Sequence, residues 1–158
     1  MARIDEIDIK LLNALQKDAK ANTKELCEVT NLSKTPVYER IHRLENEGVI
    51  TGYTATINHS KVGLPLVVFC NVSLAGHDDV HFSQFIEDIA KIDEVMECYS
   101  TGGLYDILIK VVLKDLQQYN TFVHERLTKV RGIAKIQSSF VLSEIKKTNV
   151  LQITTTDK

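Results

Sequence analysis

Apolar residues in the first fifty positions recur at helical spacing and predict three short helices. The first covers residues 5–17, where Asp5 can cap the N-terminus and the apolar stripe consists of Ile7, Leu11, Leu12 and Leu15. The second covers residues 23–30, with Thr23 as its predicted cap. The turn that follows contains Asn31, and asparagine tolerates the left-handed backbone that a tight turn between helices requires.

The third helix is predicted over residues 34–47, with Ser33 as its cap. Pro36 lies in its first turn, where a missing N–H is harmless, and Gly48 ends it. One side of this helix is apolar and should face the core, through Val37, Ile41 and Leu44. Such a helix, placed after a short helix and a tight turn, is typical of a helix-turn-helix. The alternating residues 49–58 then predict a wing or a linking ribbon.

The hydrophobic period changes beyond residues 58–65, which read as a hinge. Strands are predicted over residues 66–75, 94–101, 105–113, 133–143 and, at an edge, 148–155, and helices over residues 80–91 and 115–130. The first four of these strands, with the two helices, follow the order of a ferredoxin-like βαββαβ sandwich. We therefore predict an α+β protein in three parts: a winged helix-turn-helix (1–50), a wing or hinge linker (51–65) and a sandwich domain (66–158).

One face of the predicted sheet lacks a covering layer. Two helices can cover only one face, and the other would carry Val67, Phe69 or their neighbours. An apolar face of this kind is unfavourable in a monomer, so we expect sheets from two copies to pair in a homodimer.

Composition narrows the class of protein. The chain has 158 residues and a net charge of −2, and its first fifty residues hold eight Lys or Arg against nine Asp or Glu. No broad basic field exists to coat nucleic acid, so selective contacts must supply more of the binding. No apolar run is long enough for a membrane helix, and the N-terminus does not resemble a secretory signal, so we expect a cytoplasmic protein. Three widely spaced cysteines without a CxxC pair read as free, buried thiols.

The polar face of the third helix supplies candidate contacts to duplex DNA. The N-terminal half of a recognition helix meets base edges, which makes Thr35, Tyr38, Glu39 and His42 candidates for reading bases. The candidates for phosphate contacts are Ser33, Lys34, Arg40 and Arg43. An ordinary solvated face is the alternative, in which Glu39 and Arg40 serve equally well in ion pairs with Arg43 inside the helix.

Four segments, in order along the chain, carry a family resemblance. They are Asp5-x-x-Asp8-x-x-x-Leu12, LSKTPVYERIHRLENEGVITGYTATIN (32–58), MECYSTGGLYDILIKV (96–111) and VRGIAKIQSSFVLSEIK (130–146). Together they resemble the Lrp/AsnC family, the leucine-responsive or feast/famine transcription regulators. The resemblance implies an N-terminal winged helix-turn-helix that binds double-stranded DNA and a C-terminal sensing domain of ACT-like fold. It also implies dimers that assemble into larger rings, often octamers, with a small-molecule effector, usually an amino acid, held between dimers.

An amino-acid effector needs donors for its carboxylate and acceptors for its ammonium. The turn at Gly102 and Gly103 offers backbone N–H groups, and Asp106 offers a carboxylate. The family's loop commonly reads Gly-Asp-Tyr-Asp, whereas this chain has Gly103-Leu104-Tyr105-Asp106, which favours a more apolar effector or weaker binding. Ser138 and Ser139 match family positions near the ligand. The neighbouring strand adds the remaining candidates, Glu97, Tyr99 and Thr101.

Other functions are less well supported by the residues. His77 and His81 have the spacing of a metal-binding pair, but the sequence fixes no third ligand nearby, so we predict neither a metal nor a cofactor. No nucleotide-binding or nucleophile motif appears, and we do not expect an enzyme. Three alternatives remain: a DNA-organising, nucleoid-like protein indifferent to effector, an enzyme similar to siroheme decarboxylases, and an amino-acid-binding subunit that regulates an enzyme.

Overall fold

The computed structural model describes the backbone of residues 4–76 and 79–154, and the side chains of residues 4–76 and 82–154. The chain divides into two compact units. One contains Met1–Thr56 together with Lys146–Lys158, and the other contains Ile57–Ile145. The last segment of the chain thus groups with the first helices rather than with the sandwich.

The first unit is the predicted arrangement of three helices: α1 (Glu6–Lys17), α2 (Thr23–Thr30) and α3 (Lys34–Asn46). Leu11, Leu26 and Val37, one from each helix, form the centre of its small core. Leu44 is also fully buried, and Ile41 packs against the cluster. The predicted inner face of α3 is therefore confirmed.

The ends of these helices correct two details of the prediction. Asn22, not Thr23, caps α2, because its side chain accepts from the Glu25 backbone N–H while the Glu25 side chain accepts from the Asn22 backbone N–H. Thr23 has no acidic residue three positions later with which to make this reciprocal pair. Ser33 occupies the N-cap position of α3, but its side chain makes no capping hydrogen bond.

The turn between α2 and α3 is built as predicted. Asn31 has a φ of 57°, in the left-handed region, and its backbone N–H donates to the Cys27 carbonyl. After α3, Gly48 has a φ of 69° and redirects the chain. Residues 49–58, predicted as a wing or a linking ribbon, join no strand ladder with any described segment. Tyr53 instead anchors this stretch by donating its hydroxyl proton to Glu45 at 2.9 Å.

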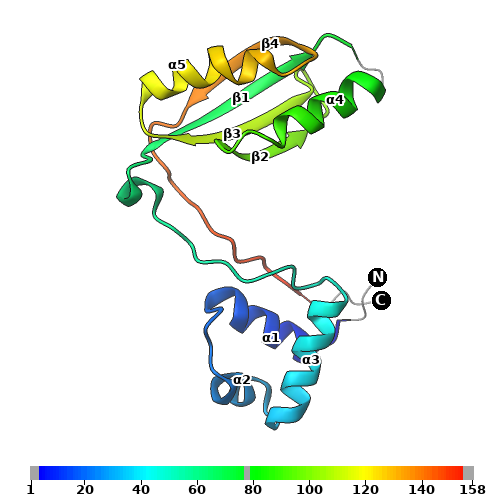
Figure 1. The fold of residues 1–158 in the computed structure, drawn as a ribbon. Helices are drawn as coiled ribbons and strands as arrows, with labels where there is room; N and C mark the ends of the chain where they lie inside the picture. The colour runs from blue at the N-terminus through cyan, green and yellow to red at the C-terminus, as the bar shows by residue number, and fades with distance from the viewer. Residues whose placement is uncertain (1–3, 77–78, 155–158) are drawn as a thin grey trace. The chain divides into compact units, whose positions relative to one another are not determined.

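The second unit is a four-stranded antiparallel sheet with two helices. Its elements are β1 (Leu66–Leu74), α4 (Asp79–Ile89), β2 (Val95–Ser100), β3 (Ile107–Leu113), α5 (Leu116–Glu125) and β4 (Ile133–Phe140), with short 3-10 turns at His59–Val62 and Leu127–Lys129. The strand order is β2-β3-β1-β4, and α4 and α5 cover the same face (Figure 1). This is the predicted ferredoxin-like sandwich.

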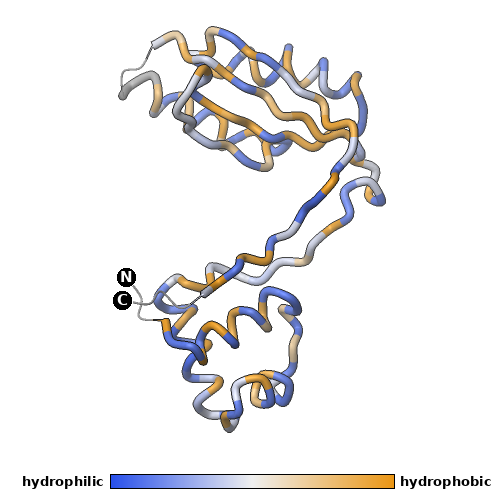
Figure 2. The backbone as a smooth tube through the Cα atoms, turned by 180° about the vertical axis from the view of Figure 1, so that it is seen from behind, coloured by the Kyte–Doolittle hydropathy of each residue, from blue (hydrophilic) through white to orange (hydrophobic). Residues whose placement is uncertain are grey.

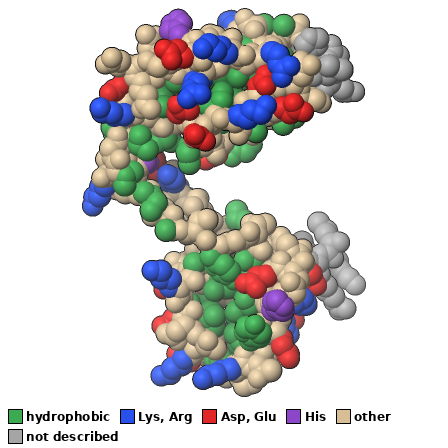
Figure 3. Space-filling view, in the orientation of Figure 1, with side chains coloured by type: hydrophobic (Ala, Val, Ile, Leu, Met, Phe, Trp, Pro, Cys, Tyr) green, Lys and Arg blue, Asp and Glu red, His purple; other side chains and the backbone are tan. Residues whose placement is uncertain are grey.

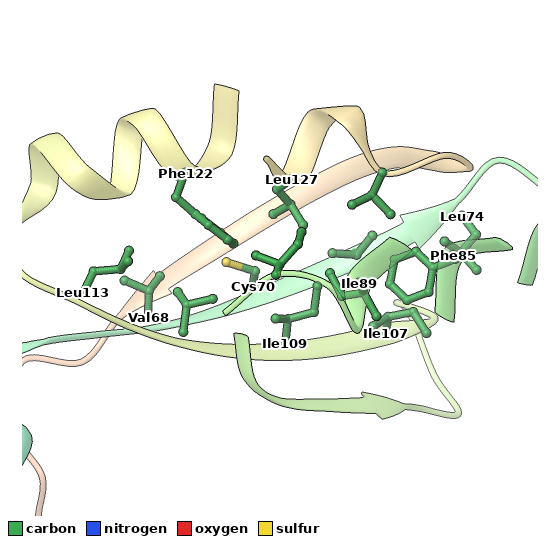
Figure 4. Close-up of a cluster of buried hydrophobic side chains, with 14 residues drawn as sticks. Val68, Cys70, Leu74, Phe85, Ile89, Ile107, Ile109, Leu113, Phe122 and Leu127 are labelled. Carbon is green, nitrogen blue, oxygen red and sulfur yellow. The ribbon is translucent and has the colours of Figure 1, made fainter. Parts of the chain in front are cut away.

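The core of this unit lies between the sheet and the helices. Alternate residues of β1 and β3 point into it, and Phe85 from α4 and Phe122 from α5 close it (Figure 4). Hydrophobic residues accordingly run along the strands (Figure 2). The buried thiol of Cys70 belongs to this core, as predicted, whereas Cys98 is exposed. Burial raises the pKa of the Cys70 thiol, which keeps it protonated.

The opposite face of the sheet has no helix over it in the described chain. Val67 and Phe69 lie on this open face, because they alternate with the inward Val68 and Cys70. Val67 is paired in register with Val112, and Phe69 with Lys110 and Ser139. The open face is thus apolar at one end of β1 and polar along β4.

The fifth strand predicted at the C-terminus is wrong. Residues 141–154 form no strand, and α5 also stops at Glu125, with a 3-10 turn in place of the last predicted helical turn. The side chain of Gln16 in α1 forms hydrogen bonds with the Leu151 backbone, which in a sheet would bond to a neighbouring strand. Its side chain accepts from the Leu151 N–H at 2.7 Å and donates to the Leu151 carbonyl at 3.3 Å. None of the described helices is long and apolar enough to span a bilayer.

Candidate nucleic-acid interface and effector site

Six of the predicted DNA-contacting residues are exposed at the N-cap or on α3: Ser33, Lys34, Thr35, Tyr38, Glu39 and His42. The opposite side of the helix is held in the core by Val37 and Leu44. The N-terminal half of α3 therefore presents a polar surface with hydroxyl, ammonium and carboxylate groups, which are the groups that contact phosphates and base edges.

An aromatic pair strengthens this surface. The rings of Tyr38 and His42, one helical turn apart, are stacked with centroids 6.1 Å apart and planes 15° apart. His42 Nδ1 also lies 3.7 Å from Glu45 Oε2. These contacts restrict the Tyr38 and His42 side chains, so less side-chain entropy remains to be lost when the helix meets a ligand.

The other two predicted contacts, Arg40 and Arg43, point elsewhere. Arg40 Nη1 donates to Asp5 at 2.7 Å and to Asp8 at 2.8 Å, and Arg43 Nη2 donates to Asp8 at 2.6 Å. Arg43 also donates to Glu47 at 3.2 Å. Both guanidinium groups thus lie against the N-terminus of α1, where Glu39 lines the same hollow.

These ion pairs shift the titration of their members. Hydrogen bonding to Asp5 and Asp8 raises the pKa of Arg40, and hydrogen bonding to Asp8 raises the pKa of Arg43. Partial burial acts to raise the pKa of Asp5, but hydrogen bonds from the Asp8 backbone and from Arg40 outweigh it, and the net shift is downward. All of these shifts favour the charged pairs at neutral pH.

The charge distribution agrees with selective rather than diffuse binding. On the face that Figure 3 shows, Lys and Arg side chains are interspersed with Asp and Glu side chains on each unit. The net charge of −2 points the same way. This charge distribution offers no broad basic field that would attract phosphates in general.

The candidate effector site centres on the turn between β2 and β3. Thr101 closes this turn with two hydrogen bonds, from its N–H to the Asp106 carbonyl and from its hydroxyl to the Tyr105 carbonyl, both 2.8 Å. Gly102 and Gly103 are exposed, with open space where a Cβ would lie, and the Leu104 side chain is 87% exposed. The Asp106 carboxylate accepts from the Leu74 N–H at 2.8 Å, so it also holds β1.

The structure does not bring all predicted effector residues together. Ser138 and Ser139 point to opposite faces of the sheet, because adjacent strand residues alternate. The Ser138 hydroxyl accepts a hydrogen bond from the Tyr119 hydroxyl of α5 on the helix-covered face. Ser139 is paired in register with Phe69 on the open face. Ser139 is also distant from the part of β4 that lies beside the turn. Lys135, which lies near the Tyr105 ring, is four residues along β4 from Ser139, or about 13 Å at the rise of a strand.

Glu97 and Tyr99 lie on the open face with Ser139. Glu97 accepts from Lys110 at 2.6 Å, and the Tyr99 hydroxyl donates to Glu97 at 2.9 Å. Tyr105 bonds to Gln137, and Lys135 Nζ lies 6.0 Å from the centroid of its ring. Gln137 and Lys135 of β4 were not among the predicted residues, because spacing along one strand does not show which residues of another segment lie beside it.

The predicted effector residues therefore lie in three places. One group lies at the turn: Thr101, Gly102, Gly103, Leu104, Tyr105 and Asp106. Glu97, Tyr99 and Ser139 lie on the open face of the strands, and Ser138 lies alone on the helix-covered face. Within the described residues, no group of three His, Cys, Asp or Glu side chains could hold a metal ion. The side chains of His77 and His81 lie outside the described residues.

Comparison with known proteins accounts for both units. Residues 4–51 match the family model for a winged helix-turn-helix DNA-binding domain, and residues 67–151 match that for the Lrp/AsnC ligand binding domain. The leucine-responsive regulatory proteins of Klebsiella pneumoniae and Escherichia coli K12 are each 37% identical to this chain over 153 residues. The match covers 96% of this chain and 93% of each relative.

Solved structures agree with these matches. A Neisseria meningitidis transcriptional regulator in complex with L-Met superposes with a TM-score of 0.89 at 34% identity, over 94% of this chain and 96% of that one. An AsnC family transcriptional regulator from Agrobacterium tumefaciens gives a TM-score of 0.88 at 32% identity, with the same coverage. The chain therefore belongs to the Lrp/AsnC family of DNA-binding transcription regulators, which join a helix-turn-helix to a ligand-binding domain.

Proposed function

We propose that this regulator reads duplex DNA with the exposed N-terminal half of α3, and that an amino acid bound at the Gly102–Asp106 turn changes that binding. The observation that carries the proposal is the division of α3 into a buried apolar side and a crowded, exposed polar side. The place of α3 directly after the turn of a helix-turn-helix supports this role, because the second helix of that motif is the one that enters the major groove.

The proposed DNA contacts follow from position on the helix. Ser33 and Lys34, at the start of α3, approach phosphates. Thr35, Tyr38, Glu39 and His42 approach base edges, where Glu39 can accept from cytosine and Thr35 can contact a thymine methyl group. Arg40 and Arg43 are not among the proposed DNA contacts, because both form ion pairs with a carboxylate of α1.

The proposed effector is an amino acid with an apolar side chain. The Neisseria relative was solved in complex with L-Met, which supports this class of ligand. In this chain the turn offers the Gly103 backbone N–H for a carboxylate, and Asp106 for an ammonium. Leu104, where the resembling family commonly has an acidic residue, offers apolar contact instead of a second negative charge.

The proposed assembly is a homodimer formed through the open face of the sheet, which then builds larger rings. Val67 and Phe69 supply the apolar part of this face. A two-fold dimer requires an imperfect palindrome in the DNA, and a ring of dimers would favour flexible, A·T-rich sites that wrap easily.

Thermal unfolding of the purified protein against a panel of amino acids tests the effector proposal. A ligand that binds only the folded state stabilises it by RT ln(1 + [L]/Kd), about 2.7 kcal/mol at roughly a hundredfold excess over Kd. We expect stabilisation by apolar amino acids at about millimolar concentration, and a change in duplex affinity with the same ligands.

Leu104→Ala provides the matched variant, because it removes an exposed apolar side chain without restoring the acidic residue that the family commonly has. We expect this variant to lose much of the stabilisation by apolar amino acids. Leu142→Ala, at another highly exposed leucine, is the control and should retain it. Equal responses of both variants would contradict a role for the turn.

The second candidate function is organisation of DNA without an effector. It is favoured by Leu104, which stands where the family commonly has an acidic residue. This function predicts duplex binding by the wild-type protein without stabilisation by any amino acid in the panel. Such a result would leave the DNA-reading surface of α3 in place and remove the sensing role.

A further inference from the structure

A buried carboxylate joins α1 to the recognition helix. Asp8 is inaccessible to solvent. Its Oδ1 accepts from Arg40 Nη1 at 2.8 Å, and its Oδ2 accepts from Arg43 Nη2 at 2.6 Å. Asp5 Oδ2 accepts from the same Arg40 nitrogen at 2.7 Å. These bonds connect residues that are 32 to 35 positions apart in the sequence.

The two aspartates are also held by hydrogen bonds within the N-terminus of α1. The Asp5 side chain accepts from the Asp8 N–H at 2.9 Å, and the Asp8 side chain accepts from the Asp5 N–H at 3.0 Å, which is a capping box at the start of α1. Asp8 therefore serves two purposes at once: it caps its own helix and binds the neighbouring one.

Contacts at two points of α3 constrain how that helix can move. Arg40 and Arg43 are three residues apart, on one side of the helix. Rotation or sliding of α3 would break at least one bond and leave a buried charge without its partner, which is costly. The orientation of the surface that carries Tyr38 and His42 is therefore tied to Asp8.

We propose that Asp8 is a positioning residue for DNA recognition, and that Arg40 and Arg43 act through Asp8 and Asp5 rather than as phosphate ligands. This inference rests on the proposed role of α3 in DNA binding. Charge balance supports it, because two guanidinium groups face three carboxylates, those of Asp5, Asp8 and Glu47, and leave little net attraction for a phosphate.

The competing role can be defined from the same geometry. Asp5, Pro36, Glu39, Arg40 and Arg43 line a shallow hollow that is open to solvent. A DNA phosphate that entered it would have to compete with Asp5 and Asp8 for the guanidinium groups. The two roles differ in their dependence on salt, because a cation that contacts phosphate releases a counterion and one that is held by a carboxylate does not.

The experiment measures duplex affinity against salt concentration for the wild-type protein, Arg40→Gln and Lys34→Gln, on a duplex selected by the wild-type protein. Loss of a phosphate contact lowers the slope of log K against log salt by about one. We expect this change for Lys34→Gln, the matched control. Arg40→Gln should keep the wild-type slope while its affinity falls about tenfold, because misplaced base contacts weaken binding at every salt concentration.

Asp8→Asn gives the complementary result. Asparagine keeps the shape of the side chain but removes its charge, so each arginine loses one of its charged partners, while Asp5 still faces Arg40 and Glu47 still faces Arg43. We expect weaker binding to the selected duplex, a steeper salt dependence and less discrimination against a scrambled duplex, because less neutralised guanidinium groups then contact phosphates without regard to sequence.

A double-mutant cycle of Asp8→Asn and Arg40→Gln in urea unfolding, without DNA, tests the link itself. We expect the two effects on the free energy of unfolding to be non-additive. Additive effects, or a salt slope for Arg40→Gln reduced as in Lys34→Gln, would overturn the positioning role and leave the proposed function intact. Failure of the wild-type protein to bind any duplex would instead overturn the proposed function and the positioning role with it.

Discussion

At the scale of residues, the exposed side of α3 combines two kinds of contact that mutation can separate. Tyr38, which is 69% exposed and stacked on His42, is placed to read bases, whereas Lys34 is placed to hold phosphate. Loss of a base contact reduces affinity only for the preferred sequence, and loss of a phosphate contact reduces it for every sequence.

Tyr38→Ala should therefore weaken binding to the selected duplex by about 1–3 kcal/mol and leave binding to a scrambled duplex nearly unchanged. Lys34→Gln should weaken both. Fluorescence anisotropy with the two duplexes measures the difference. Equal losses on both duplexes for Tyr38→Ala would show that this ring does not read sequence.

The lowered pKa of Asp5 makes a second prediction at this scale. A carboxyl group whose pKa is lowered on folding stabilises the folded protein at any pH above its ordinary pKa, which is 3.8 for this group. This stabilisation is lost as the pH falls through the lower pKa of the folded state. The substitution Asp5→Asn keeps a side chain that caps helices well but removes the charge. We expect the wild-type protein to be the more stable at neutral pH and the difference to vanish in acid.

Urea unfolding of the two proteins between neutral pH and about pH 3 measures this difference. The sign follows from the ion pair with Arg40, which exists only while Asp5 is ionised. A difference that stayed constant across the range would mean that the Asp5 charge contributes nothing and that only its capping oxygen matters.

At the scale of elements, the turn between α2 and α3 sets the entry of the recognition helix. Its left-handed residue, Asn31, has a φ of 57°. Asn31→Gly should be nearly neutral, whereas Asn31→Val should cost about 1–2 kcal/mol because a branched side chain is strained in this region. Hydrogen exchange of the backbone amides in residues 23–46 reports the local stability. Equal protection in both variants would contradict the requirement for a left-handed backbone.

The elements also show where prediction from sequence succeeds. Helical and strand periods are local, so α1, α3, β1 and β3 were predicted almost to their ends, and the ligand-binding fold followed from their order. Asn22 as the cap of α2 was also available from sequence, because Glu25 follows it at the spacing of a capping box, but Thr23 was chosen instead.

The remaining differences concern partners that are distant in sequence. A strand needs a neighbouring strand to pair with. The alternation in residues 49–58 and 148–155 is typical of a strand, but it does not tell whether a partner strand lies alongside. In the described residues neither segment has one. Helix phase also could not show that Arg40 and Arg43 pair with carboxylates of α1, more than thirty residues away, and their assignment to phosphates stays a prediction. Paired acids at Asp5 and Asp8, with the spacing of the two arginines, were the signal that could have revealed them.

At the scale of the whole molecule, the proposed function depends on assembly as well as on the single chain. Phe69 lies on the open face of the sheet, where a second copy is proposed to pair. Phe69→Lys should shift the protein from dimers or larger species toward monomers in sedimentation velocity, because a charge would be buried at the interface. Leu116→Lys, at an exposed leucine of α5, is the control. An unchanged distribution for Phe69→Lys would place the interface elsewhere.

The most direct test of the central claim is selection of bound duplexes from a randomised pool, followed by sequencing. It would compare the wild-type protein with a variant that carries Thr35→Ala, Tyr38→Ala and His42→Ala, all on the exposed side of α3. The account predicts that the wild-type protein enriches an imperfect palindrome and that the variant, still folded, enriches none. Enrichment of the same sequence by both proteins would show that another part of the molecule reads the DNA.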